Sequence, residues 1–327
     1  CGDAGSSGER HEVADVRVVL TGCAGFLGFH LATILLERGD QVVCVDNLIS
    51  GTRRNVDDLA AAHDGFEFIE HDVSEPFSVE GSVDAVMHFA SPASVPDYLA
   101  NPLLTLRAGS YGTFNTLNLA REHEARYLVA STSEIYGEPQ VHPQPESYWG
   151  NVNPVGPRSV YDEAKRFAES ATAAYRRTYD TDTSIVRYFN TYGPRMRPED
   201  GRVVTNFVVQ ALLGKPLTIY GDGTQTRSFG YVGDIAAGTI ALLDSGHPGP
   251  MNIGTPIEFT MLKLAEVVLE LTGSSSELSF EPLPEDDPTQ RRPDITVARE
   301  VLGWEPTTTL HEGLPPTIDY LRGLLQL

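Results

Sequence analysis

The sequence has few cysteines and no long apolar stretch. Only three of its 327 residues are cysteines, Cys1, Cys23 and Cys44, and their spacing fits neither a metal site nor a disulfide framework. We therefore expect Cys23 and Cys44 to be buried thiols, as in proteins of a reducing cytoplasm. No apolar run approaches the length of a membrane span, and the polar, glycine-rich start of the chain is unlike a signal peptide. These absences predict a soluble, cytoplasmic protein that does not bind membranes.

Basic residues are also scarce. The chain has 24 lysines and arginines against 45 acidic residues, so its net charge is −21, which argues against nucleic acid as a partner. An anionic ligand would need a local cluster of arginines against this background. No metal site is predicted. The length allows a full hydrophobic core and predicts one large domain or two interlocked ones.

A strand–turn–helix–strand pattern near the N-terminus organises the chain. The β-branched run Val16–Leu20 predicts a buried strand, and Phe29–Arg38 carry apolar residues at helical spacing before a glycine. A G-x-x-G-x-x-G turn over residues 22–28 joins them, and the apolar run Gln41–Val45 predicts the next strand. This arrangement is typical of a dinucleotide-binding βαβ unit. An ordinary glycine-rich turn in an α/β domain is the alternative.

The turn and the end of the second strand supply what a dinucleotide needs. Gly22, Gly25 and Gly28 allow a pyrophosphate to approach backbone N–H groups closely, at a helix N-terminus that favours negative charge. Asp46 ends the second strand, where a carboxylate can bind both ribose hydroxyls of NAD and would repel the 2′-phosphate of NADP. We therefore expect NAD as the cofactor.

Strand and helix patterns alternate along the chain, which predicts an α/β fold with a Rossmann-type doubly wound parallel sheet. A smaller, interlocked C-terminal α/β domain is expected to bind the substrate. We expect residues 1–13 to be disordered, a cofactor domain over 14–187 plus about 229–254, and a substrate domain over about 188–228 plus 255–327. Further strands are expected at Phe66–Glu70, Val83–Phe89, Ala125–Ala130 and Ile185–Tyr188, and a long helix at Thr105–His123.

Loops after the predicted strands carry further candidates, because ligands of such sheets bind at the carboxyl ends of the strands. The loop 47–51 is positioned to close over the adenosine ribose. Asp72 could accept a hydrogen bond from the adenine amino group or cap its own loop. The small residues at 90–94 either let a flat cofactor approach the backbone or form a plain turn.

Tyr161 and Lys165 are a candidate acid–base pair. They are four residues apart and share one face of a helix. A free tyrosine has a pKa of about 10, too high for a base at neutral pH, but a neighbouring ammonium and a nicotinamide cation both favour the phenolate. Thr132, at the end of the fifth strand, could hold a substrate alcohol against Tyr161. A Tyr-x-x-x-Lys spacing also occurs in helices by chance. Its position after a Rossmann-type half of the chain favours the catalytic interpretation.

Arginines recur in loops of the second half of the chain, at Arg195, Arg197, Arg227 and 291–292. Guanidinium groups bind phosphate or carboxylate bidentately, so in a strongly acidic chain they suggest an anionic ligand. Any one of them could instead be a solvated surface side chain, but their accumulation favours recognition. The proline-rich residues 283–293 are expected to form an ordered loop over the site.

Together these residues resemble the extended short-chain dehydrogenase/reductase superfamily (NAD-dependent epimerase/dehydratase) of nucleotide-sugar enzymes, and within it the UDP-glucuronate decarboxylase (UDP-xylose synthase) family. The similarity covers almost all of the chain after residue 14. The glycine motif is common to the whole superfamily. The more specific stretches are Ala130–Gly137 (ASTSEIYG), Tyr161–Arg166 (YDEAKR), Asn190–Met196 (NTYGPRM), Asp200–Phe207 (DGRVVTNF) and Pro284–Thr296 (PEDDPTQRRPDIT).

The resemblance implies oxidation of UDP-glucuronate at C4 by bound NAD, loss of carbon dioxide from the β-keto acid, and reduction at C4 to give UDP-xylose. It implies that Ser133 and Arg291 orient the carboxylate and that Glu134 acts on the C5 side, as an acid/base or through water. The implied catalytic residues are Thr132, Ser133, Glu134, Tyr161, Lys165 and Arg291. The implied cofactor-binding residues are Gly22, Gly25, Phe26, Leu27, Gly28, Asp46, Asn47, Ser50, Gly51, Asp72, Val73, Phe89, Ala90, Ser91, Tyr161 and Lys165. The implied substrate-binding residues are Arg107, Asn190, Val204, Asn206, Tyr220, Gln225, Arg227 (for the pyrophosphate) and Arg291.

Other residues bear on which member of the superfamily the chain resembles. The 4,6-dehydratases typically carry an Asp in place of Ser133, and 4-epimerases usually lack a Glu at the position of Glu134, so the resemblance argues against both. Cys23 replaces a usual glycine, at a variable position of the glycine motif. Residues 107–109, Arg-Ala-Gly, replace a usual Lys-Thr-Asn, which leaves the usual substrate in question. The alternatives are another nucleotide-sugar conversion, such as 4-keto pentose formation, 4,6-dehydration or 4-epimerisation, and a non-catalytic NAD or nucleotide-sugar sensor.

The resemblance also carries an expectation about assembly. Superfamily members usually pair two helices from each subunit in a four-helix bundle. We therefore expect a homodimer, formed through the helices around Thr105–His123 and Tyr161–Tyr179.

Overall fold

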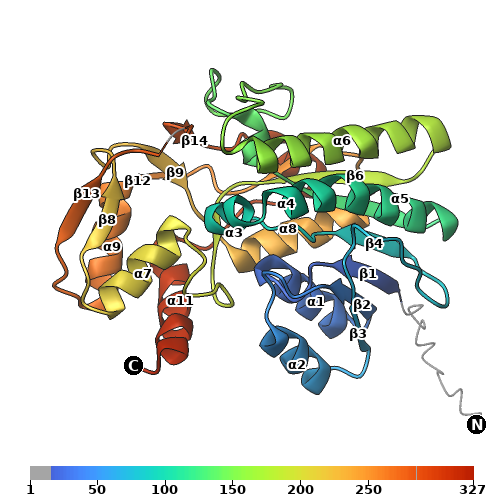
Figure 1. Ribbon diagram of the computed structural model, residues 1–327, viewed down its shortest axis with the longest axis horizontal. Helices are drawn as coiled ribbons and strands as arrows, with labels where there is room; N and C mark the ends of the chain where they lie inside the picture. The colour runs from blue at the N-terminus through green and yellow to red at the C-terminus, as the bar shows by residue number, and fades with distance from the viewer. Residues whose placement is uncertain (1–15, 285) are drawn as a thin grey trace, which may run out of the picture.

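The computed structural model describes residues 16–284 and 286–327, which form a larger part built on one sheet and a smaller part beside it (Figure 1). The disorder expected for residues 1–13 falls outside the described residues. Within the described ranges, no helix is both long enough and apolar enough to cross a membrane.

Seven parallel strands form the large sheet, in the order β11-β6-β5-β4-β1-β2-β3. From β3 to β6 this is the strand order of a doubly wound Rossmann fold, in which helical crossovers connect parallel strands. The predicted α/β fold with such a sheet is confirmed. The strands are β1 (Arg17–Thr21), β2 (Gln41–Asp46), β3 (Phe66–Glu70), β4 (Ala85–His88), β5 (Arg126–Thr132), β6 (Thr183–Tyr188) and β11 (Met251–Ile253).

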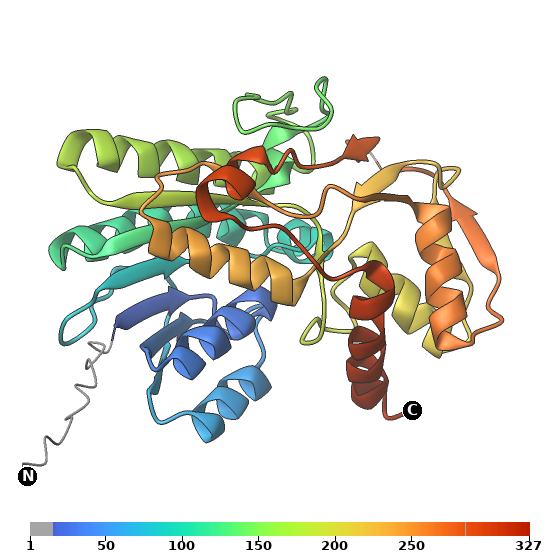
Figure 2. The same cartoon turned by 180° about the vertical axis from the view of Figure 1, so that it is seen from behind.

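Helices cover both faces of this sheet, because successive side chains of a strand point to opposite faces. In β1, Val18 and Leu20 pack into one core and Val19 into the other, and all three are fully buried. Burying such a side chain contributes about 1.5–3 kcal/mol. One face is covered by α1 (Phe26–Arg38), α2 (Arg53–Ala62), α8 (Val232–Ser245) and α10 (Thr296–Leu302), and the other by α5 (Thr113–Glu122) and α6 (Ser159–Tyr179), with α3 (Val95–Ala100) and α4 (Pro102–Arg107) beside them (Figure 1, Figure 2).

The long helix expected over residues 105–123 is interrupted. Between α4 and α5 the chain makes a π-helical turn, η1 (Ala108–Gly112), a local geometry often found at functional sites. A Cβ on Gly109 would lie 2.6 Å from the Cβ of Ala164 in α6, which is too close for two carbon atoms. Glycine therefore lets η1 pack against α6 directly beside Lys165, so this departure from the family pattern has a packing partner.

The smaller part has its own core, which includes the buried residues Phe207, Leu217, Leu264 and Leu314. Between its segments, α8 and β11 return to the large sheet, so the two parts interlock. Its helices are α7 (Val203–Leu212), α9 (Met261–Thr272) and α11 (Leu310–Leu325). Its strand pairs are β8 (Leu217–Tyr220) with β13 (Leu278–Glu281), β7 (Thr191–Tyr192) with β10 (Gly230–Tyr231), and β9 (Thr226–Ser228) between β12 (Glu258–Thr260) and β14 (Gln290–Arg291).

The expectation of free thiols at Cys23 and Cys44 is wrong, because the two cysteines form a disulfide. Cys44 lies in β2 opposite Leu20 of β1, and the turn after β1 brings Cys23 beside it. Their Cα atoms are 5.7 Å apart, within the range that a disulfide spans. The pairing depends on the register that places Cys44 opposite the end of β1, and this register is not revealed by sequence spacing. It also removes the argument for a reducing compartment.

Candidate active site

A cavity of about 540 Å³ lies at the carboxyl ends of the central strands, between the larger and the smaller part. β1 and β4 are neighbours in the sheet, and the helices that follow them cover opposite faces. Ligands of doubly wound folds bind at such a topological switch point. The larger part contributes residues 22, 24–28 and 130–134 to the lining, and the smaller part contributes 218–220.

The glycine turn leaves no room for side chains. Gly22 has a φ of +77°, and a Cβ on it would lie 2.6 Å from the backbone nitrogen of Ala90. A Cβ on Gly28 would lie 2.2 Å from the carbonyl oxygen of Gly22. The helix α1 starts after Gly25 with no side-chain cap, so its first N–H groups are available to an anion. The turn fits the pyrophosphate of a dinucleotide.

Two acidic residues at strand ends flank the adenosine side of the cavity. Asp46 is buried and accepts hydrogen bonds from the backbone N–H groups of Ala24 (3.1 Å) and Leu48 (2.8 Å), so it fixes the turn and presents a carboxylate to a ribose. Asp72 accepts from the backbone N–H and the hydroxyl of Ser74 at 2.9 and 2.8 Å. Asp72 therefore caps its own loop, which is one of the two alternatives predicted for it. It also lines the cavity.

Most of the predicted residues come together around this cavity. All of the predicted cofactor-binding residues line it, as do five of the predicted catalytic residues and five of the predicted substrate-binding residues. The catalytic and substrate-binding members of the lining are Thr132, Ser133, Glu134, Tyr161, Lys165, Asn190, Asn206, Tyr220, Gln225 and Arg227.

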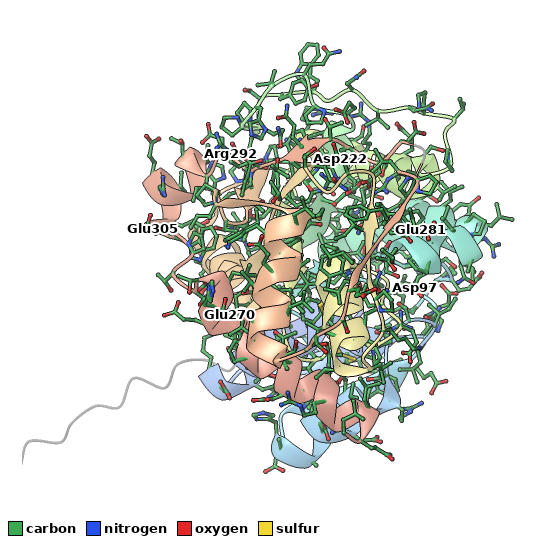
Figure 3. All side chains as sticks on the ribbon, turned by 90° about the vertical axis from the view of Figure 1, so that its left-hand side faces the viewer. Asp97, Asp222, Glu270, Glu281, Arg292 and Glu305 are labelled. Atoms are coloured by element: carbon green, nitrogen blue, oxygen red, sulfur yellow. A yellow bond between two sulfur atoms is a disulfide. The ribbon has the colours of Figure 1, made fainter. Side chains whose placement is uncertain are left out.

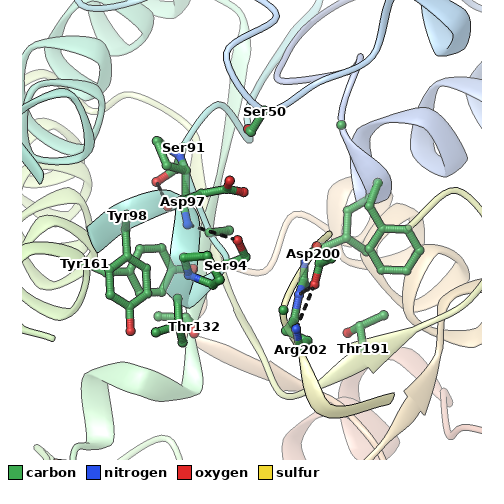
Figure 4. Close-up of a pocket in the computed structure, with 18 of the residues that line it drawn as sticks. Ser50, Ser91, Ser94, Asp97, Tyr98, Thr132, Tyr161, Thr191, Asp200 and Arg202 are labelled. Carbon is green, nitrogen blue, oxygen red and sulfur yellow. Dashed lines mark hydrogen bonds and ion pairs between the residues drawn. The ribbon is translucent and has the colours of Figure 1, made fainter. Parts of the chain in front are cut away.

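Thr132 comes from β5, and Tyr161 and Lys165 come from α6, which packs on β5. Figure 4 labels Thr132 and Tyr161. The Lys165 ammonium donates to the carbonyl oxygen of Ala130 at 2.8 Å, and burial lowers the pKa of Lys165 to about 8. Burial and the Glu134 carboxylate raise the pKa of Tyr161 above its ordinary value, and the Thr132 hydroxyl opposes them only in part. Tyr161 is thus neutral in the ligand-free site, and its use as a base requires the positive charges of Lys165 and of a nicotinamide.

Tyr98, in α3, stacks on Tyr161. The two rings are nearly parallel, with centroids 5.3 Å apart and an interplanar angle of 6° (Figure 4). The Tyr98 side chain lines the cavity, and its buried hydroxyl has no hydrogen-bond partner among the described residues. The stacking fixes the plane of the Tyr161 ring.

Glu134 lies between two arginines at the end of the cavity. It follows β5 in the short helix η2 (Ser133–Tyr136), and its carboxylate pairs with Arg291 and, at 2.8 Å, with Arg158. Burial opposes ionisation of Glu134, but the two guanidinium groups outweigh it and hold its pKa well below the usual range. Arg291 also donates to the carbonyl oxygen of Gly137 at 2.9 Å. Glu134 is therefore a carboxylate in the ligand-free site.

A second ion-pair bridge involves the predicted pyrophosphate ligand. Asp287, in the proline-rich loop, pairs with Arg227 at 3.0 Å and with Arg158 at 3.2 Å. In contrast, the acidic side chains of Asp222, Glu270, Glu281 and Glu305 are exposed on the surface of the chain (Figure 3). The charges of Arg158, Arg227 and Arg291 are thus balanced by carboxylates of the same chain.

Three predicted residues do not line the cavity. Arg107 is exposed at the end of α4, and Val204 is buried in the core of the smaller part. Arg291 is only 2% exposed and lies behind Glu134, with its Nε atom unpaired among the described residues. Contact between Arg291 and a substrate carboxylate therefore requires that Arg291 exchange its pairing with Glu134.

Two residues of the site escaped prediction, Tyr98 and Arg158. Arg158 lies three residues before Tyr161, and the helical spacing that pairs Tyr161 with Lys165 places it nearby as well. Tyr98 follows the small-residue loop after β4, in a short helix whose position over the cavity is set by tertiary packing. No local pattern marks it.

The fold, the glycine turn and the Tyr-x-x-x-Lys pair define the class of protein, an NAD-dependent enzyme of the extended short-chain dehydrogenase/reductase type. The sequence profile of the GDP-mannose 4,6 dehydratase family matches residues 19–317. The chain belongs to this family.

Individual proteins and a solved structure are also similar to this chain. UDP-glucuronic acid decarboxylase 2 of Arabidopsis thaliana is 52% identical over 307 residues, which cover 94% of this chain and 68% of that protein. UDP-glucuronic acid decarboxylase 1 of Xenopus tropicalis is 49% identical over 310 residues, 95% of this chain and 73% of that protein. The crystal structure of UDP-glucuronic acid 4-epimerase from Bacillus cereus, in complex with UDP-glucuronic acid and NAD, has a TM-score of 0.84 and 29% identity, and the match covers 94% of this chain and 100% of that one.

Proposed function

We propose that this chain converts UDP-glucuronate to UDP-xylose by NAD-dependent decarboxylation. Relatives that are about half identical over nearly the whole chain carry the name of that activity. The observation that carries the proposal within the site is the Glu134–Arg291 pair, which adjoins the cavity that Thr132, Tyr161 and Lys165 line. A carboxylate-binding group next to an alcohol-oxidising group is what a uronic acid decarboxylase requires.

Tyr161 removes the proton from the sugar 4-hydroxyl, and Thr132 holds that hydroxyl against the phenolate. Lys165, anchored on the carbonyl oxygen of Ala130, supplies the positive charge that lowers the cost of the phenolate. NAD, when bound, would supply the hydride acceptor for oxidation at C4 and the hydride donor for the later reduction. The glycine turn and Asp46 would hold it.

The 4-ketone is β to the carboxylate, so it accepts the electron pair that is left when carbon dioxide departs. Ser133, which is buried at the end of β5, and Arg291 orient the carboxylate. A strong ion pair with Arg291 stabilises the ground state, whereas the charge moves to the enolate in the transition state. Arg291 therefore serves positioning and selectivity, and the ketone drives bond cleavage.

Arg227 binds the pyrophosphate, and Asn190, Asn206, Tyr220 and Gln225 hold the uridine side. Asp287 must release Arg227 for this, so binding couples to movement of the proline-rich loop. Arg227 is only 9% exposed, so its ion pairs are stronger than those of a solvated arginine. Arg107 and Val204, which do not face the cavity, are left out of this set.

We also propose a homodimer formed through the helices around residues 105–123 and 161–179, which are α4, η1, α5 and α6. Large apolar side chains on this layer, Leu103, Tyr111, Phe114 and Phe167, are between 39% and 73% exposed. A second copy would cover them. Sedimentation of the chain and of a Leu103→Glu/Phe167→Glu variant tests this, and a wild-type monomer would contradict it. The cytoplasmic location stays a proposal without support from the cysteines.

The function is tested by incubating the purified chain with NAD⁺ and either UDP-glucuronate or UDP-glucose. We expect carbon dioxide and a UDP-pentose from the first and no 4-keto hexose from the second. Carbon dioxide with a 4-keto pentose would indicate an oxidative variant of the reaction. Cofactor binding without carbon dioxide release would refute the proposal and favour a sensor or another sugar.

A further inference from the structure

A second cavity, of about 340 Å³, lies on the other side of the ion-pair cluster. Arg158 and Asp287 line both cavities, so the cluster forms the wall between them. Charged side chains take part in its lining, and the space is large enough for several water molecules. Its lining residues are Gly137, Glu138, Asn151, Val152, Asn153, Arg158, Asp162, Asp286 and Asp287.

Asp162 is the buried carboxyl group of this second cavity. It follows Tyr161 in the first turn of α6 and is 7% exposed. Its Oδ1 atom has no hydrogen-bond partner among the described residues. A buried carboxyl oxygen without a partner is costly, and a catalytic role or a bound water is among the reasons for which native structures keep one.

Asp162 interacts with charged groups on every element packed around it. Glu134 from η2 and Glu163 from α6 repel its negative charge, while Arg158 and Arg291 attract it. Tyr98, from α3, and Tyr161 also interact with Asp162, and Glu138, Asp286 and Asp287 share its cavity. Burial and the Glu134 charge prevail and raise the pKa of Asp162 to about 7. Of two neighbouring carboxyl groups, Glu134 is ionised and Asp162 can hold a proton at neutral pH.

The proposed decarboxylation consumes one proton in each turnover. The C5–C6 bond breaks, its electron pair forms the enolate of the 4-ketone, and carbon dioxide leaves. A proton must then form the new C5–H bond. The proton on Tyr161 came from the 4-hydroxyl and returns to that oxygen when C4 is reduced, so it is not available to C5. The second proton has to come from solvent.

Substrate binding itself favours uptake of this proton. When the sugar carboxylate takes Arg291, Glu134 loses that partner and gains a neighbouring negative charge. The carboxyl groups of the sugar, Glu134 and Asp162 then share two guanidinium groups, those of Arg158 and Arg291. One of the three carboxyl groups is therefore protonated more easily than before. Glu134 faces the substrate cavity, whereas Asp162 faces the second cavity.

We infer that Asp162 and the second cavity supply the proton that C5 receives. This inference rests on the proposed function. The Asp162 carboxyl group passes its proton to Glu134, Glu134 gives a proton to C5 of the enolate, and the ionised Asp162 takes a proton from water in the second cavity. Asp162 is a relay residue that acts through Glu134 and does not touch the sugar.

The test is a single-turnover reaction of the NAD⁺-loaded chain with UDP-glucuronate, followed by the absorbance of the reduced nicotinamide and by carbon dioxide. In the Asp162→Asn variant, which keeps size and polarity, we expect the absorbance to rise at the wild-type rate and carbon dioxide to appear. The absorbance should then decay about 100-fold more slowly than in wild type, because a positioned proton donor is missing. Glu163→Gln, which removes the neighbouring half-exposed carboxylate of the same helix, is the matched control. It should leave the rise and the low-pH decay at their wild-type rates and only move the high-pH decline to lower pH, because Glu163 repels the charge of Asp162.

The pH dependence gives a second readout. Asp162 can donate only while protonated, so the wild-type decay rate should be constant below about pH 7 and fall above it. This decline should be absent in Asp162→Asn and restored in Asp162→Glu. Unchanged decay and pH dependence in Asp162→Asn would overturn the inference, and so would equal slowing of the rise and the decay. Absence of carbon dioxide with the wild-type chain would instead overturn the proposed function, and the relay with it.

Discussion

The cofactor side and the carboxylate side of the site are built in different ways. On the cofactor side, backbone groups and small residues form the site, as in the turn from Gly22 to Gly28 and the loop at Ala90. On the carboxylate side, charged side chains from distant segments pair with one another, as Arg291 does with Glu134 across 157 positions of sequence. One side is shaped by local sequence, and the other only by the complete fold.

This difference has a consequence for binding. The cofactor side needs no internal substitute for its ligand, because N–H groups at a helix end are tolerated without a partner when they face a polar cavity. Buried arginines need a counter-charge, since an unpaired buried charge is costly. Glu134 and Asp287 supply it in the ligand-free chain. Substrate anions therefore bind by exchange of partners.

The largest effect is expected at the junction of the two sides. Tyr161→Phe removes the base but keeps the ring that stacks on Tyr98. Turnover should fall by roughly three orders of magnitude, as for loss of a positioned acid–base group. Affinity for NAD, measured by calorimetry, should stay within about twofold because the turn and Asp46 are untouched. Substantial residual activity would remove Tyr161 from the base role.

A change on the cofactor side alone should affect stability and leave sugar recognition intact. Reduction of the Cys23–Cys44 disulfide, or Cys23→Ala, opens a loop with a sequence separation of 21. The free energy of unfolding in urea should fall by about 3 kcal/mol, since cross-links of this loop size stabilise by that amount. The KM for the nucleotide sugar should not change. Equal stability of the oxidised and reduced chains would contradict the pairing.

A change on the carboxylate side should weaken recognition of the sugar and leave the cofactor side intact. Arg291→Lys keeps the charge but loses the planar group that pairs with Glu134 and with the Gly137 carbonyl. The preference for the uronic acid over the neutral sugar should drop by about 2 kcal/mol, or roughly 30-fold, in kcat/KM. NAD affinity is the control. An unchanged preference would assign carboxylate recognition to another residue.

The smallest expected effect concerns the packing between η1 and α6. Gly109→Asn, which restores the residue usual in the family, places a Cβ against Ala164 and should destabilise by about 1–2 kcal/mol. Ala164→Gly alone costs about 1 kcal/mol in a helix. The double variant should be more stable than the sum of the two predicts, as urea unfolding of all four chains would show. Strict additivity would mean that the two positions do not interact.

Much of the fold and the cofactor side could be predicted from the sequence, because periodicity and glycine spacing are local properties. β2 and β3 start as predicted, and the glycine turn and Asp46 lie where the βαβ pattern puts them. The Tyr161–Lys165 pair follows from helical spacing in the same way. Each of these depends on the periodicity within one element or on the succession of neighbouring elements in one βαβ unit.

The remainder depends on tertiary neighbours. The disulfide requires β1 and β2 to be adjacent, and the π-turn at Ala108–Gly112 reflects the approach of α6. The burial of Arg291 behind Glu134, in place of a direct position on the cavity, follows from the path of the proline-rich loop. No periodicity in the chain encodes these contacts.

The central claim is that one bound sugar is oxidised at C4, decarboxylated and reduced again within a single site. The most direct test uses UDP-glucuronate that carries deuterium at C4, with NAD⁺ and no added reductant. The account predicts release of carbon dioxide and UDP-xylose that retains the deuterium at C4. A UDP-pentose without the label, or a 4-keto product that accumulates, would contradict it.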